Sequence, residues 1–158
     1  MKSTICKIAI SVILSCFILF PLSAKQLFVS PEGDDSADGS SSGNAFKTMS
    51  KAVDAAEEGD EIVLLGIIDI SQEPADKIYN SDAYNKNNQG VKILDKGLTI
   101  SGDPNQTRTK TGFTGNKTTT CLRLDGLNKK VIIRNLTIKE GNPTSDKGAG
   151  CFIRNANV

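Results

Sequence analysis

Short apolar segments recur along this chain, and two of them contain the tripeptide Leu-Thr-Ile, at positions 98–100 and 136–138. A glycine follows each copy within a few residues, and two further apolar segments begin at Cys121 and Cys151. A recurring strand-and-turn unit is typical of folds that are built by stacking similar units. We therefore interpret the two copies as equivalent positions in successive units, with the segment 107–120 interposed as a connector.

One helix is predicted, over Thr48–Glu58, because apolar residues recur at spacings of three and four from Phe46 to Ala56. The Thr48 hydroxyl can cap its first turn, and Gly59 can end it in a left-handed conformation. Period-two and continuous apolar runs predict strands elsewhere. The predicted strands are Gln26–Ser30, Glu61–Leu65, Ile67–Ile70, Val91–Leu94, Leu98–Ser101, Cys121–Leu124, Val131–Arg134, Leu136–Lys139 and Cys151–Arg154.

Many short strands with little helix fit either an antiparallel sandwich or a parallel stack. Two-residue hairpin signals are scarce, with Asp125-Gly126 as the one case, and the connectors are irregular. Both observations favour an all-β fold, a right-handed parallel β-helix, in which each coil has three short strands. The predicted helix would cap the N-terminal end of the stack. Asn135 suits a tight left-handed corner, and the polar segment 71–90 is predicted to be an inserted loop.

The first 24 residues have the pattern of a secretory signal peptide. Lys2 and Lys7 precede an apolar run from Ile8 to Leu22, and Ala24 offers a small residue for cleavage. A retained membrane anchor is the alternative, but the run is shorter than the roughly 20 residues that cross a bilayer. Lipidation at Cys16 is a further alternative. We expect an exported protein, secreted or on a bacterial cell surface or outer membrane, with no membrane span in the mature chain.

Charge and composition exclude several classes of function. Loss of Lys2 and Lys7 changes the formal net charge from +1 to −1, so a basic surface for nucleic acid is not expected. The chain has no histidine, which excludes nucleophilic sites that use an imidazole base and zinc sites that use imidazole ligands.

Acidic residues do not form a recognisable site in the sequence. Asp69, Asp95 and Asp125 stand singly at strand ends, which favours a solvated role over catalysis. Asp34, Asp35 and Asp38 resemble the start of a calcium loop, but position twelve of that loop is Ala45 instead of Glu. Tyr79 and Tyr84 lie among amides in the inserted loop, where anchoring is favoured over sugar stacking. No catalytic residue, metal ligand or cofactor is predicted.

Cys121 and Cys151 each stand near the start of a similar predicted strand, and stacking would bring them together. An exported protein permits a disulfide between them. Two buried thiols, packed as small apolar side chains, are the equally weighted alternative.

The first part of the mature chain resembles the N-terminal cap of bacterial β-helix proteins of the pectin-lyase-like superfamily. The residues that carry this resemblance run in order from Leu27 through Pro31-Glu32-Gly33-Asp34-Asp35 to Gly59-Asp60-Glu61-Ile62. The segments Val131–Asn142 and Gly148–Asn155 are similar to repeats of polymorphic outer membrane proteins and related adhesins. Ala149 and Cys151 depart from the Gly-Gly-Ala-Ile motif of those repeats. The resemblance implies a cap over 25–66 and the first coils of a β-helix over 67–158.

Two functions follow as expectations. The first is a non-catalytic surface protein that adheres to a glycan or a host surface protein. The alternative is the N-terminal part of a polysaccharide lyase or glycoside hydrolase of the same fold. A free-standing module that binds a partner through an open edge is a third interpretation. Since the sequence stops at Val158, where another strand should continue, we also expect it to be a fragment of a longer β-helix. A naturally short gene product is the alternative.

Overall fold

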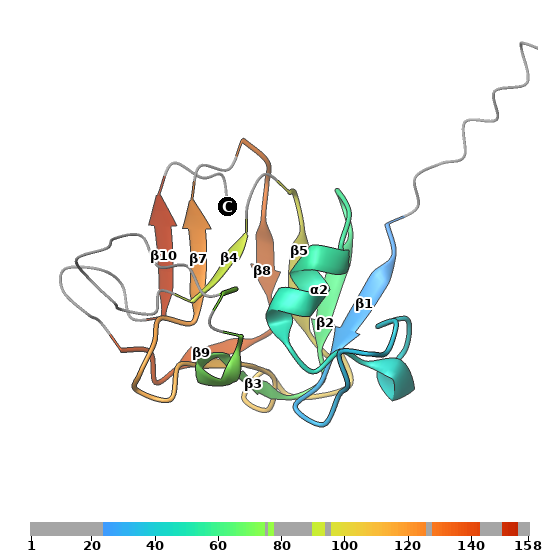
Figure 1. Cartoon of the computed structure of the whole chain (residues 1–158), viewed down its shortest axis with the longest axis horizontal. Coiled ribbons are helices and arrows are strands. Elements are labelled where there is room, and N and C mark those ends of the chain that lie inside the picture. The colour runs from blue at the N-terminus through green and yellow to red at the C-terminus, as the bar shows by residue number, and fades with distance from the viewer. Residues whose placement is uncertain are drawn as a thin grey trace, which may run out of the picture.

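The computed structural model describes residues 24–74, 76–77, 90–93, 96–125, 128–142 and 150–154, which fold mostly as short strands in three parallel sheets (Figure 1). The strands are β1 (Gln26–Val29), β2 (Glu61–Leu64), β3 (Ile67–Asp69), β4 (Val91–Ile93), β5 (Thr99–Gly102), β6 (Gly112–Thr114), β7 (Leu122–Asp125), β8 (Ile132–Arg134), β9 (Thr137–Lys139) and β10 (Cys151–Arg154). The helices are η1 (Ser42–Asn44), α2 (Met49–Ala55) and η2 (Ile70–Gln72).

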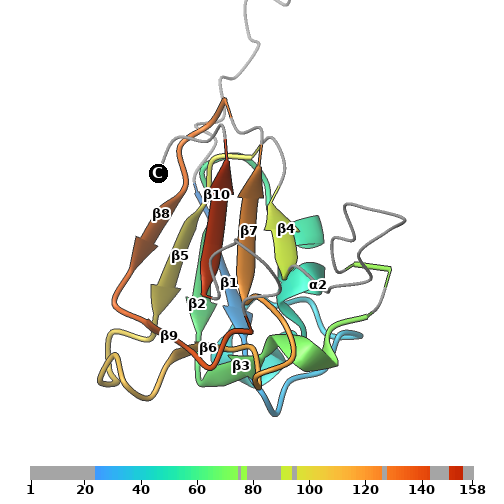
Figure 2. The same cartoon turned by 90° about the vertical axis from the view of Figure 1, so that its left-hand side faces the viewer.

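From β2 onward the chain visits the three sheets in rotation. The first sheet has the order β1-β2-β5-β8, the second β3-β6-β9 and the third β4-β7-β10. Every pairing between these strands is parallel. Figure 2 shows the first and third sheets standing beside each other, with the second running across their lower end. This arrangement is an all-β parallel fold and is compatible with a β-helix or solenoid.

The core lies between the three sheets and is built from apolar residues in register. Successive strands of the first sheet align Leu27, Ile62, Ile100 and Ile133. The other two sheets contribute aligned sets in the same way, and alternate side chains along each strand face inward. These sets are Ile68, Phe113 and Ile138, and Ile93, Leu124 and Ile153.

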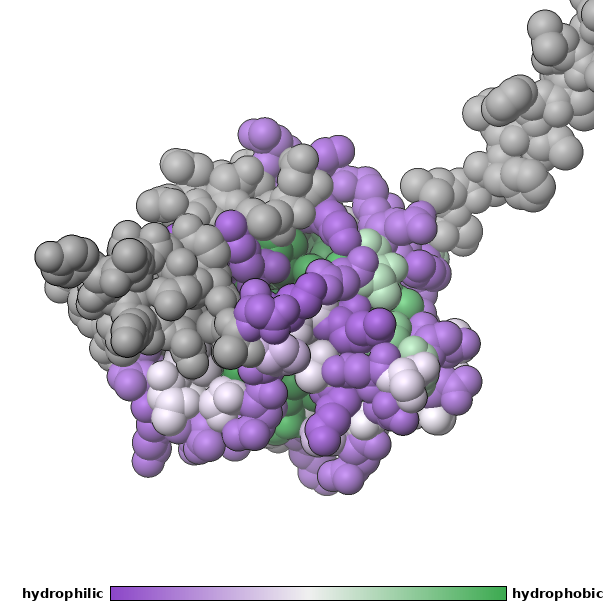
Figure 3. All heavy atoms as spheres, in the orientation of Figure 1, coloured by the Kyte–Doolittle hydropathy of each residue, from purple (hydrophilic) through white to green (hydrophobic). Residues whose placement is uncertain are grey.

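Burial falls from the first coils to the last described coil. Ile62 and Ile100 are fully buried, whereas Ile133 is only partly buried. In the third sheet Leu124 is fully buried and Ile153 is 47% exposed. Ile132 and Ile153, both in the last described coil, are the large hydrophobic residues that the described part exposes. Most of the coloured atoms on the face drawn in Figure 3 are hydrophilic.

The helix α2 covers the beginning of the stack, as the sequence predicts. It packs against β1 and β4, which are edge strands of two different sheets, and buries Met49, Ala52 and Val53. The Thr48 side chain accepts a hydrogen bond from Lys51 N, which confirms the predicted cap. The helix ends at Ala55, shorter than predicted, because the chain turns before Gly59, whose φ is 89°.

All the predicted strands have counterparts within one or two residues, and one strand was missed. The segment 107–120, predicted as a connector, contains β6, which pairs with both β3 and β9. The interpretation of the two Leu-Thr-Ile copies is therefore wrong. The first copy lies in β5 of the four-stranded sheet and the second in β9 of another sheet, so they are not equivalent positions.

Asn135 forms the predicted corner, with φ at 51°, between β8 and β9. No helix in the described part of the chain is long and apolar enough to cross a membrane. The predicted signal peptide falls outside the described residues except for Ala24, and most of the predicted inserted loop, including Tyr79 and Tyr84, falls outside them as well.

Candidate binding groove on the four-stranded sheet

The outward side of the four-stranded sheet carries a groove, since alternate residues of its strands point away from the core. One aligned set of outward positions is Gln26, Glu61, Thr99 and Ile132. The next set is Phe28, Val63, Ser101 and Arg134.

Two adjoining hollows, of about 910 Å³ and about 530 Å³, lie over these positions. Gln26, Phe28 and Glu61 line both, so the hollows form one continuous groove. The larger one extends to residues before β1 and in the loop before α2, and the smaller one extends over β5 and β8. The further lining residues are Ala24, Lys25, Leu27, Asp38 and Ser40–Ser42 in the larger, and Val63, Ser101–Asn105, Arg134 and Asn135 in the smaller.

A polar network at the centre of the groove takes one side chain from each of the four strands. Gln26 Nε2 donates to Glu61 Oε2 at 3.0 Å. Ser101 Oγ and Arg134 Nη2 both donate to Glu61 Oε1, each at 2.7 Å. Glu61 and Arg134 also form an ion pair in which the glutamate side chain is 18% exposed and the arginine 61%. The network therefore fixes the Glu61 carboxylate while part of Arg134 faces solvent.

Glu61 is held in its ionised form. Burial on its own would raise its pKa, but the hydrogen bonds from Arg134, Ser101 and Gln26, together with the positive charge of Arg134, outweigh this effect. The net result is a pKa below the usual value for a glutamate. At neutral pH Glu61 is an acceptor of hydrogen bonds, so it cannot donate a proton.

The three aspartates that resemble the start of a calcium loop do not converge. Asp34 accepts from Ser36 N at 2.8 Å, and Asp38 accepts from Ser40 N and Oγ at 3.0 and 2.7 Å. Hydrogen bonds to those serines lower the pKa of both aspartates. Asp35 instead accepts from the backbone nitrogens of Lys47 and Thr48, both at 2.9 Å.

Within the described part of the chain, no group of three or more Cys, Asp or Glu residues could hold a metal ion. Of the strand-end aspartates, Asp69 accepts from Ser71 N and Oγ at the start of η2. Asp95 and the side chain of Asp125 lie outside the described residues. Among the aspartates singled out in the sequence, Asp38 is the one that lines the groove.

A second carboxylate, Glu73, lies buried at the start of α2. It accepts hydrogen bonds from Met49 N at 2.6 Å, from Ser50 N at 3.0 Å and from the Ser50 hydroxyl. Burial raises its pKa, although the hydrogen bonds from Ser50 and Met49 oppose this effect. Glu73 also lines a small hollow of about 120 Å³ with Thr48 and Ile68, among other residues. We interpret it as a structural anchor between the chain after β3 and the helix.

The sequence does not indicate the residues that form the polar network of the groove. Glu61 and Arg134 are separated by 73 positions, and neither belongs to a local motif. Glu73 lies within the segment 71–90, which the sequence predicts to be an inserted loop. The one signal that could identify the network residues is that each polar residue occupies an outward position in its strand. To see that these positions adjoin, one must know which residues of neighbouring strands pair, and the sequence does not give that register.

Comparison with known proteins gives no match: no family model, no curated protein and no solved structure resembles the chain closely enough to be counted.

Proposed function

We propose that this chain is an exported surface protein of right-handed β-helix architecture, and that it binds a glycan along the outer face of its four-stranded sheet. The rotation of the chain through three parallel sheets, with a helix at one end, supports the β-helix. The resemblance of residues 27–62 to pectin-lyase-like caps supports the superfamily, and the pattern of residues 1–24 supports export.

The observation that carries the binding function is the groove with Glu61 at its centre. Its polar lining offers a carboxylate, amides and hydroxyls, which accept and donate hydrogen bonds in the way that sugar hydroxyls require. Phe28 and Val63 add an apolar floor against which the C–H face of a sugar ring can pack. The groove is open along its length, which suits an oligosaccharide lying across the strands.

The same geometry favours binding over cleavage. Glycoside hydrolysis requires a protonated carboxyl group that gives its proton to the leaving oxygen, and a second, ionised carboxylate that acts as a base or nucleophile. Glu61 is ionised, and the three side-chain donors that satisfy it also make it a weak base. We therefore assign Glu61 to ligand binding and to fixing the partners around it.

A glycan array followed by titration calorimetry tests the proposal. We expect the wild-type chain to bind at least one immobilised oligosaccharide, and we expect Phe28→Ala and Glu61→Gln to weaken that binding by tenfold or more, roughly 1.4 kcal/mol. Glu32→Gln is the matched control, because Glu32 is exposed and lies outside the groove.

The proposal fails if no glycan on the array is bound, or if the two groove variants bind as tightly as wild type. Incubation with pectin and related glycans gives a separate reading. Release of unsaturated or shortened sugars would overturn the assignment as a binding protein and favour the polysaccharide-lyase or hydrolase alternative.

A further inference from the structure

Cys121 and Cys151, the two cysteines that the described part contains, lie on neighbouring parallel strands of the third sheet. Cys151 pairs in register with Leu122, and Cys121 N donates to Gly150 O at 3.2 Å. The two cysteines are therefore one residue out of register. Parallel strands about 4.8 Å apart with a rise of about 3.3 Å per residue place their Cα atoms about 6 Å apart. Disulfides bridge Cα atoms separated by about 4.4–6.8 Å.

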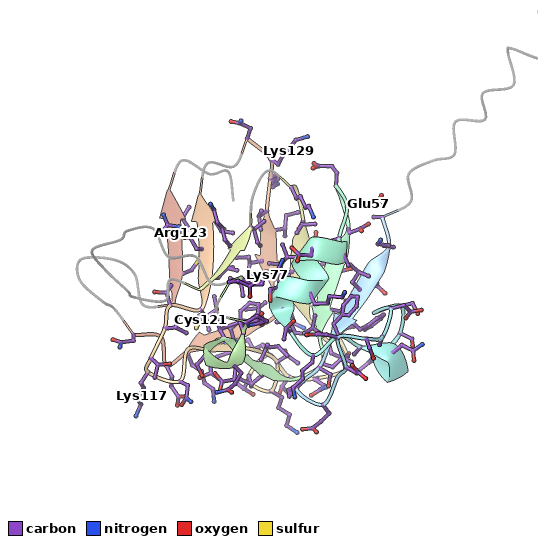
Figure 4. All side chains as sticks on the ribbon, in the orientation of Figure 1. Glu57, Lys77, Lys117, Cys121, Arg123 and Lys129 are labelled. Carbon is purple, nitrogen blue, oxygen red and sulfur yellow. The ribbon has the colours of Figure 1, made fainter. Side chains whose placement is uncertain are left out.

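Both side chains contribute to the hydrophobic core. Cys121, labelled in Figure 4, is fully buried within the hydrophobic core, and the partly buried Cys151 packs against that core. Neighbouring residues of a strand point to opposite faces, but Cys121 precedes the first residue of β7, so this alternation does not fix the direction of its side chain. Its Sγ lies 3.6 Å from Lys139 O at the end of β9, in the coil that contains Cys151. Both residues are free thiols in the structure.

We propose that Cys121 and Cys151 form a disulfide that joins β7 to β10 when the protein folds under oxidising conditions. This inference goes beyond the proposed function and is independent of the groove. It selects one of the two states that the sequence leaves open for these cysteines.

The oxidant we name is a small-molecule disulfide such as glutathione disulfide. The Cys151 thiolate attacks one sulfur of the oxidant, and one glutathione thiolate leaves. The Cys121 thiolate then attacks the Cys151 sulfur of the mixed disulfide, and the second glutathione thiolate leaves. The two cysteines lose two protons and two electrons, and the oxidant is reduced to two glutathione thiols. Cys151 reacts first because it is less buried than Cys121.

The fold also sets when this reaction can occur. Burial, with a contribution from the neighbouring Cys151, raises the pKa of Cys121 to about 12, and burial raises that of Cys151 as well. Thiolates carry out the exchange, so the folded dithiol reacts slowly. We expect the bond to form during folding, as β10 pairs with β7 and before the core closes over the two thiols.

The test is refolding of the full chain, with Cys6→Ser and Cys16→Ser so that two cysteines remain. One sample is refolded with a mixture of reduced and oxidised glutathione, and another with a reducing agent. Peptide mapping by mass spectrometry without reduction is expected to find Cys121 and Cys151 in one linked peptide in the oxidised sample. The oxidised sample is expected to melt roughly 5–10 °C higher than the reduced one.

Three results would overturn the proposal. Both thiols could remain titratable in denaturant after oxidative refolding, Cys151 could stop at the mixed disulfide with glutathione, or the linkage could join two chains. The peptide mapping uses a chain in which Cys121 and Cys151 are both retained. These outcomes therefore do not depend on whether a variant of either cysteine folds. Cys151→Ser serves as the negative control for the linked peptide.

Discussion

At the scale of single residues, Glu61 connects more of the fold than any local pattern around it indicates. Its carboxylate receives side chains from β1, β5 and β8, so it joins all four strands of its sheet. Its pKa is below the usual value because hydrogen bonds and the charge of Arg134 outweigh the effect of burial. The folded state therefore favours the ionised form more than the unfolded chain does.

This difference predicts how stability depends on pH. A lowered pKa in the folded state means that the stabilisation by Glu61 is present above the unfolded pKa, about 4.3, and is lost as pH falls through the folded value. We expect Glu61→Gln to be less stable than wild type by about 1 kcal/mol at pH 7, with the difference shrinking below pH 4. Urea unfolding at a series of pH values measures it. A difference that stays constant with pH, or that Glu32→Gln reproduces, would contradict the assignment.

At the scale of elements, α2 depends on a residue far from it in the sequence. Met49 N and Ser50 N belong to the first turn, where backbone nitrogens have no partner within the helix. Glu73, which follows η2, accepts from both and is itself buried. The helix start and the chain after β3 are thus held together by one carboxylate.

Removing this carboxylate should weaken the cap of the stack. We expect Glu73→Ala to lower the free energy of unfolding by about 2–3 kcal/mol, because it leaves two buried N–H groups without an acceptor. Glu73→Gln keeps one acceptor oxygen and should cost less. Lys51→Ala, an exposed position on the same helix, is the control. Denaturant unfolding curves of the three variants decide, and equal losses from Glu73→Ala and Lys51→Ala would show that Glu73 is not an anchor.

The strand β6 depends on a glycine. Gly112 has φ at 144°, and a Cβ atom placed there would lie 1.8 Å from Thr137 O of the neighbouring β9. A side chain at this position must push the two strands apart and adopt an unfavourable backbone conformation. The segment 107–120 was predicted as a connector because this strand is short and starts with that glycine.

We expect Gly112→Ala to destabilise the fold by about 2–4 kcal/mol. Gly43→Ala is the matched control, since nothing lies within 4 Å of a Cβ atom placed there. Thermal unfolding followed by circular dichroism measures both. If the two variants melt together, β6 does not pair with β9 as described.

At the scale of the whole molecule, stability should fall along the part of the stack that the structure describes. In a stacked fold each coil is stabilised by its neighbours, and a coil with a neighbour on one side alone opens more readily. In the described part of the chain, β8, β9 and β10 each pair on one side, and their inward residues are less buried than those of β2 and β5.

Hydrogen exchange measured by mass spectrometry should show this order. Amides of β2 and β5 are expected to exchange at least tenfold more slowly than those of β8 and β9. Uniform protection across the four strands of the first sheet would contradict a stack stabilised by its neighbours.

The sequence is sufficient to predict where the helix and most strands lie, but not how the strands assemble into sheets. Apolar periodicity located α2 and most strands, since local burial decides where those residues can lie. The identical tripeptides at β5 and β9 do not mark equivalent positions, although the sequence suggests that they do. Both strands need an inward apolar residue, and this requirement does not indicate to which sheet a strand belongs. The Glu61 network could not be foreseen, because it arises from pairing between segments whose connectors differ in length. Asn135 was predictable, since its backbone geometry is a local property.

The parallel register has a consequence for how such a protein can change. The chain between the paired residues Glu61 and Thr99 is longer than that between Thr99 and Ile132, yet the outward row remains unbroken. Spacing within the groove is thus independent of the length of the connecting segments. Whole loops can be lengthened or shortened while the outward row keeps its geometry, whereas one residue added inside a strand turns that strand's row toward the core. If the groove binds a glycan as we propose, variation in its preference is expected through substitutions at outward strand positions and through loop length, with strand length held fixed.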